Sequence, residues 1–127
     1  MIGPGQRRIL PWDVQPGSAP NDMAIIYDEI RTLIDAPAGT DAPTLAAIED
    51  TLTAGYARAL ELEAERMRLE RRLSEIAVQL HSASADGANE EIVEVGERLS
   101  ATDGDLTRLR ALLGRLRDRA RGVRAAS

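Results

Sequence analysis

The sequence predicts an all-α protein: a long antiparallel two-helix hairpin, paired as a coiled coil, with a short N-terminal helix and a disordered N-terminal tail. Two long stretches joined by a short turn carry apolar residues at heptad spacing. The chain has no phenylalanine, one tryptophan and two tyrosines, so its apolar content is mainly Leu, Ile, Val and Ala. Mixed with Glu and Arg, that composition is typical of long helices and coiled coils.

Residues 1–20 form the predicted tail. They contain four prolines and three glycines, and proline fixes φ and removes an amide donor, so we expect an extended or disordered segment. Trp12 lies in a short hydrophobic island of this tail, within the sequence ILPWDV. Two roles remain open for this island: it docks on a partner protein, or it packs as a strap on its own helices.

A short amphipathic helix is predicted over 21–35, capped at Asn21 or Asp22. Its apolar residues recur at helical spacing and form one stripe: Met23, Ile26, Ile30, Leu33 and Ile34. Pro37 ends the helix, and residues 36–43 (APAGTDAP) form a linker.

The antiparallel hairpin is predicted over 44–125, with its turn near 82–89, where the sequence SASADGAN contains small and turn-forming residues. The a and d positions of the first arm are apolar apart from Arg66 and Gly55: Leu45, Ile48, Leu52, Gly55, Ala59, Leu62, Arg66, Leu69, Leu73, Ile76, Leu80 and Ala83. Those of the second arm include one polar residue, Thr102: Ile92, Val95, Leu99, Thr102, Leu106, Leu109, Leu113, Leu116, Ala120 and Val123. A short connection between arms of similar length makes them antiparallel neighbours.

The charge pattern supports the same pairing. The second arm begins acidic and ends rich in arginine, as the helix macrodipole favours. In an antiparallel hairpin its basic end faces acidic residues of the first arm, Glu49, Asp50, Glu61 and Glu63. Its acidic start faces Arg68, Arg71 and Arg72. Arg66, at an a position, is expected near Leu106 and flanked by Thr102, Asp103 and Asp105, where it fixes the register of the arms; contact with a ligand is the alternative. Gly55 and Ala59 allow the facing helix to approach closely, or they leave a groove for a partner side chain.

A two-helix hairpin buries only one seam, so its remaining apolar surface needs a cover. Tyr56, Leu60 and Met67 form a second stripe away from the seam, and Leu112 flanks the seam on the other arm. The helix over 21–35 or a second copy of the chain could cover this surface. Exposed patches of this kind mark an interface, so the predicted partner-binding residues are Trp12, Ile26, Ile30, Leu33, Ile34, Tyr56, Leu60, Met67 and Leu112.

Composition argues against several classes of function. The chain has no cysteine and one histidine, His81, so we expect neither a metal site nor an enzyme active site, and no cofactor. The arginine-rich end does not favour nucleic acid, because the net charge is −5 and no aromatic residues are interleaved with the arginines. No apolar run is long enough for a membrane span and no signal sequence is recognisable, so we expect a cytoplasmic protein.

The second arm carries the pattern Asp103-x3-Thr107-x2-Arg110-x3-Gly114-x3-Asp118. It resembles the E-x3-S-x2-R-x3-Q-x3-D signature of the RsiG-type anti-sigma factors, also described as aerial mycelium formation proteins. Arg110 and Asp118 match that signature, and Gly114 departs from its glutamine. The resemblance implies a two-helix coil that binds cyclic di-GMP and holds a sigma factor inactive. Arginine and aspartate can bind phosphate and guanine edges.

The sequence therefore predicts a non-enzymatic helical protein–protein interaction module, a small regulatory adaptor or anti-factor. Its partner is another protein or a second copy, with a homodimer favoured because symmetric pairing is the commonest form of self-association. The alternative is a cyclic di-GMP-responsive, anti-sigma-like sensor that holds the nucleotide at Asp103, Thr107, Arg110 and Asp118.

Overall fold

The computed structural model describes residues 20–39, 42–81 and 87–126. Within these ranges the chain forms three helices and no strand: α1 (Pro20–Asp35), α2 (Leu45–His81) and α3 (Ala88–Ala126). The prediction of an all-α protein is confirmed. The predicted tail up to residue 19, with Trp12, lies outside the described residues, as does most of the predicted turn, at residues 82–86.

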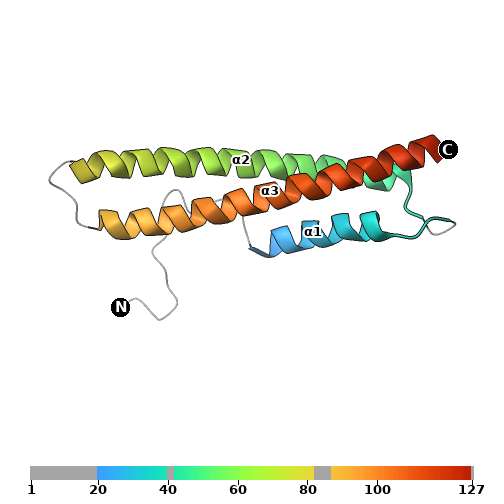
Figure 1. The fold of residues 1–127 in the computed structure, drawn as a ribbon, viewed down its shortest axis with the longest axis horizontal. Coiled ribbons are helices and arrows are strands. Elements are labelled where there is room, and N and C mark those ends of the chain that lie inside the picture. Colours follow the sequence, from blue (N-terminus) through green and yellow to red (C-terminus); the bar gives the residue numbers. More distant parts are fainter. Residues whose placement is uncertain (1–19, 40–41, 82–86, 127) are drawn as a thin grey trace.

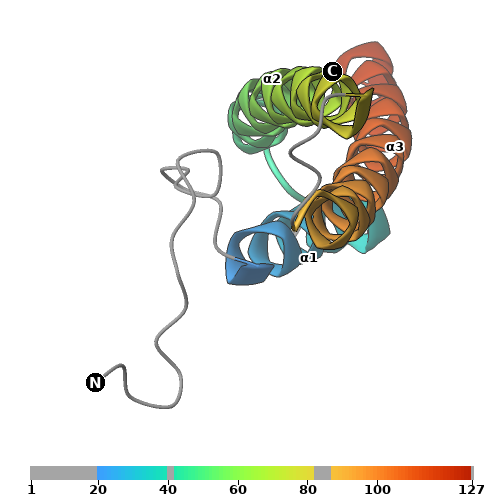
Figure 2. The same cartoon turned by 90° about the vertical axis from the view of Figure 1, so that its left-hand side faces the viewer.

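The two long helices lie side by side along their length, and α1 packs mainly on α3 (Figure 1). The view along the helices shows α1 beside α3 (Figure 2). Ion pairs join opposite ends of the long helices. Glu49 near the start of α2 pairs with Arg124 at 2.5 Å, and Nε of Arg72 in the second half of α2 donates a hydrogen bond to the carboxylate of Glu91 at 2.7 Å.

The helix ends follow local chemistry. Thr44 caps α2, because its Oγ1 accepts a hydrogen bond from the amide of Ala47 at 3.1 Å. Gly87 has a φ of 78°, a left-handed conformation that suits glycine, and α3 begins directly after it, inside the range expected for the turn. α1 begins at Pro20, earlier than the predicted cap. Proline is tolerated in the first turn of a helix, where its missing amide has no helical partner.

The core consists of two clusters along the α2–α3 seam. The larger one includes α1 and contains Leu62 and Leu109, and the smaller one contains Ile76 and Val95. Leu73 and Leu99 both pack against the smaller cluster. Among the described residues, the apolar heptad positions of α2 and α3 are therefore buried or partly buried in these clusters, with one exception. Leu80 is 38% exposed, because it lies in the last turn of α2, outside both clusters.

At Gly55 the two long helices pack closely together. It is buried, and a Cβ atom added there would collide with the side chain of Leu113. Leu113 is itself buried, so it has little space in which to move. The absence of a side chain at residue 55 thus lets α3 pack directly on the α2 backbone.

We expect Gly55→Ala to lower the melting temperature, whereas Gly104→Ala should raise it. Alanine favours a helix over glycine by about 1 kcal/mol at both positions. At residue 104 a Cβ meets no atom within 4 Å, so this gain is realised. At residue 55 the collision with Leu113 outweighs it, because overpacking costs about 1–3 kcal/mol. Thermal denaturation of both variants checks this, and a stabilised Gly55→Ala protein would contradict it.

Candidate functional site

α1 covers part of the apolar surface that the sequence left unassigned. Ile30 and Leu112, both expected on an exposed partner-binding surface, are buried within the chain. Ile26, Leu33 and Ile34 are partly buried against the same core cluster. These five residues thus pack inside the chain because α1 folds back on α3.

The C-terminal end of α1 is held by an arginine of α3. The guanidinium of Arg119 donates hydrogen bonds to the carbonyl oxygens of Ile34 at 3.1 Å and Ala36 at 2.8 Å. Carbonyl groups at a helix end lack partners within the helix, and a cation there also suits the helix dipole. Both carbonyl groups thus have a hydrogen-bond donor while α1 packs on α3.

The second predicted stripe remains uncovered among the described residues. Tyr56, Leu60 and Met67 are 43%, 67% and 58% exposed, respectively. We call this surface, together with the exposed Ala57 and Ala64, the outer face of α2. It follows a second heptad register, in which residues 57 and 64 are a positions and residues 60 and 67 are d positions.

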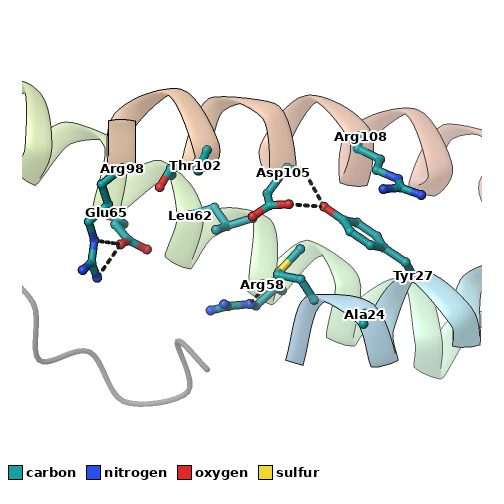
Figure 3. Close-up of a pocket in the computed structure, with 11 residues that line it drawn as sticks. Ala24, Tyr27, Arg58, Leu62, Glu65, Arg98, Thr102, Asp105 and Arg108 are labelled. Atoms are coloured by element: carbon teal, nitrogen blue, oxygen red, sulfur yellow. Dashed lines mark hydrogen bonds and ion pairs between the residues drawn. The ribbon is translucent and has the colours of Figure 1, made fainter. Parts of the chain in front are cut away.

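The opposite side of α2 faces a pocket between all three helices. It has a volume of about 500 Å³, and Figure 3 shows its wall, with Arg58, Leu62 and Glu65 from α2 on one side. Glu65 is five residues after Leu60, or about 140° around the helix. The pocket and the outer face of α2 are therefore separate surfaces. The remaining residues that line the pocket are Met23, Ala24, Tyr27, Arg98, Ala101, Thr102, Asp105 and Arg108.

Tyr27 anchors α1 at this pocket. Its hydroxyl lies 2.8 Å from a carboxylate oxygen of Asp105 and 3.1 Å from the backbone carbonyl oxygen of the same residue (Figure 3). The guanidinium of Arg108 lies over the ring, 4.6 Å from its centroid, as in a cation–π contact. Burial and the hydrogen bond to Asp105 raise the pKa of Tyr27, so the hydroxyl stays protonated as a donor.

Glu65 and Arg98 form the second polar contact of the pocket. One carboxylate oxygen of Glu65 accepts a hydrogen bond from Nε of Arg98 at 3.1 Å and forms an ion pair with Nη2 of the same guanidinium, also at 3.1 Å. Glu65 is only 7% exposed. Burial raises the pKa of Glu65 and lowers that of Arg98, because each charged form loses water. Both carboxylates of the pocket are thus engaged with neighbouring side chains, and these contacts tie the three helices together.

Sequence reasoning missed both Tyr27 and Glu65. Tyr27 shares helical spacing with Met23 and Ile30, and all three are buried, so that spacing was the available signal. Glu65 follows the d position Leu62 by three residues, on the side where α1 packs. Its burial could not be anticipated without the position of α1.

We expect the raised pKa of Glu65 to make stability depend on pH. Because its folded-state pKa lies above the unfolded value, folding favours the protonated carboxyl, and stability falls as pH rises through the folded pKa. Glu65→Gln removes this dependence. As the pH rises from about 4 to about 7, the wild type should therefore lose stability relative to Glu65→Gln. Urea unfolding of both proteins checks this, and a constant or opposite difference would contradict it.

The four residues of the sequence pattern on α3 are exposed and lie along one side of that helix: Asp103, Thr107, Arg110 and Asp118. Arg110 forms an ion pair with Glu63 of α2, and Asp103 lies 3.5 Å from Arg66, as the heptad register predicts. Asp118 lies 3.5 Å from Arg121 on its own helix. Three of the four therefore have charged neighbours.

Two general properties concern the described residues only. Within residues 20–39, 42–81 and 87–126, no three His, Asp or Glu side chains are placed to hold a metal ion. No helix in these ranges combines the length and the apolar character that a membrane span requires.

Comparisons with protein-family models, with curated proteins and with solved structures found no match.

Proposed function

We propose that this protein is a non-enzymatic interaction module, in which α2 and α3 form an antiparallel coiled-coil hairpin and the outer face of α2 docks a partner helix. The exposure of Leu60 and Met67, at 67% and 58%, is the observation that carries the proposal. Exposed apolar side chains at heptad spacing are the usual basis of helix-to-helix recognition. The role that fits is a small regulatory adaptor or anti-factor, for which the RsiG-type resemblance adds a sigma factor as one candidate partner.

The contacts of the other helices with α2 support the proposal that the hairpin holds the outer face of α2 in place. α1 covers the other apolar side of the hairpin, and the ion pairs of Glu49, Glu63 and Arg72 with α3 lie along the seam. Exposed ion pairs contribute little stability individually, but they favour one register of the helices. A rigid helix pair presents its exposed side chains in a fixed geometry, which lowers the entropic cost of binding.

Affinity capture with matched baits tests the proposal. The wild-type chain, Leu60→Glu and Val93→Glu serve as baits in extracts of the native host. Val93 is an exposed apolar residue of α3 that lies away from the outer face of α2. Leu60→Glu should lose the captured proteins, because binding would bury a carboxylate in an apolar contact, while Val93→Glu should keep them. Equal capture by all three baits would exclude the outer face of α2 as the binding surface.

The exposed row of Asp103, Thr107, Arg110 and Asp118 on α3 supports a second candidate function, the cyclic di-GMP-responsive sensor. Arg110 would have to exchange Glu63 for the ligand, so Glu63→Gln should increase the affinity for the nucleotide. A thermal shift titration tests the candidate. Saturation at a hundredfold excess over Kd contributes about 2.7 kcal/mol of stability, and the absence of any shift in both proteins would exclude the sensor.

A further inference from the structure

We propose that the pocket between the three helices is the docking site of Trp12, so that the hydrophobic island ILPWDV packs on its own helices rather than on a partner protein. The sequence alone leaves both roles open for this island. The pocket and the outer face of α2 are separate surfaces, so this inference is independent of the proposed function.

The pocket extends past the N-terminal end of α1. Met23 and Tyr27, in the first half of α1, contribute to its wall. Glu65 and Arg98 line it beyond the start of that helix, along the two long helices (Figure 3). The chain therefore enters α1 at Pro20 beside the pocket, and the residues that precede Pro20 start from this place.

The length of chain before α1 gives Trp12 access to the whole pocket. In the sequence Trp12 precedes Pro20 by eight residues, and eight residues span at most about 26–29 Å. Along α3 the lining residues run from Arg98 to Arg108, which corresponds to about 15 Å of helix. Such a short tether also gives an effective concentration of roughly millimolar, so this pocket has an advantage over a separate partner protein.

The walls of the pocket suit the faces of an indole ring. Three arginines line it, Arg58, Arg98 and Arg108, and guanidinium groups stack on aromatic faces, most favourably on tryptophan. Arg108 already makes this kind of contact with the ring of Tyr27. Leu62 adds apolar surface, and the volume of about 500 Å³ is larger than an indole side chain.

The pocket also offers acceptors for the indole N–H group. A buried tryptophan usually donates this hydrogen to a partner. Glu65 and Asp105 both line the pocket, and a carboxylate accepts up to about four hydrogen bonds, so their existing contacts leave capacity for one more. Polar and apolar walls thus match the two parts of the same side chain.

Fluorescence tests the proposal, because Trp12 is the only tryptophan of the chain. We expect the emission of the wild type to lie at shorter wavelength than in urea, with weaker quenching by acrylamide, because the docked indole is shielded from water. Both properties should be the same at every protein concentration, since docking takes place within one chain.

Matched variants locate the docking site. Ala101 and Ala24 are exposed residues on the lining of the pocket, from α3 and α1, respectively. Glutamate at either position adds bulk and attracts the guanidinium groups that would stack on the indole. Ala101→Glu and Ala24→Glu should therefore each shift the emission toward the wavelength observed in urea and increase quenching. Ala111→Glu, at an exposed residue of α3 outside the pocket, should leave both unchanged.

Three outcomes would overturn the proposal. Wild-type emission at the wavelength observed in urea would mean that Trp12 is undocked and accessible to a partner protein. A short wavelength that persists in Ala101→Glu and Ala24→Glu, or that Ala111→Glu abolishes equally, would mean that the pocket is not the docking site. A short wavelength that is lost on dilution would mean that Trp12 docks on a second copy of the chain.

Discussion

Leu109→Ala is expected to lower the free energy of unfolding by about 2–4 kcal/mol. Leu109 is fully buried in the larger core cluster, where α1, α2 and α3 meet. Truncation removes the apolar contacts of the side chain and leaves a cavity. The cavity persists because the surrounding helices, which are packed against one another, relax only partially. Because the cluster includes residues of all three helices, we expect the whole transition to shift to lower urea concentration.

The matched control is Val93→Ala on the same helix. Val93 is exposed, so its truncation should change the free energy of unfolding by less than about 0.5 kcal/mol. Urea unfolding followed by circular dichroism measures both variants. A loss below about 0.5 kcal/mol for Leu109→Ala would mean that the seam lies elsewhere on α3.

Ile30→Ala should destabilise the docking of α1 by a similar amount, about 2–4 kcal/mol. Ile30 is fully buried, and α1 contacts the rest of the chain along one side only. The hydrogen bonds of Tyr27 with Asp105 and those of Arg119 with the end of α1 remain in this variant, but each contributes only about 1 kcal/mol. We therefore expect α1 to detach before α2 and α3 unfold.

Hydrogen exchange distinguishes this local detachment from global unfolding. In Ile30→Ala, amide protection should fall in α1 more than in the core of α2 and α3. Ile25→Ala is the control, since Ile25 lies on the same helix and is 56% exposed. Full protection of α1 in Ile30→Ala would show that the polar contacts alone fix this helix.

Local pattern accounts for the long helices. Each apolar residue at heptad spacing lies on the same side of its helix as the next, so periodicity along the chain is enough to predict which side is buried. Leu62, Leu69, Leu106 and Leu109 were assigned to the core in this way, and they are buried. Leu80 was assigned incorrectly, because periodicity does not reveal where packing ends near a helix terminus.

The sequence by itself determined the all-α class, the three helices and the buried side of α2 and α3, because these depend on residues three or four positions apart. Only the tertiary structure decided that Leu112 is buried in the core cluster that includes α1 and that Tyr27 meets Asp105, 78 residues away. It also decided that Glu65 is buried beside Arg98. These contacts depend on how α1 orients on the two long helices, and several such orientations satisfy the same apolar pattern. The final choice comes from side-chain shape and from pairing of buried polar groups, which act only once the helices are in contact.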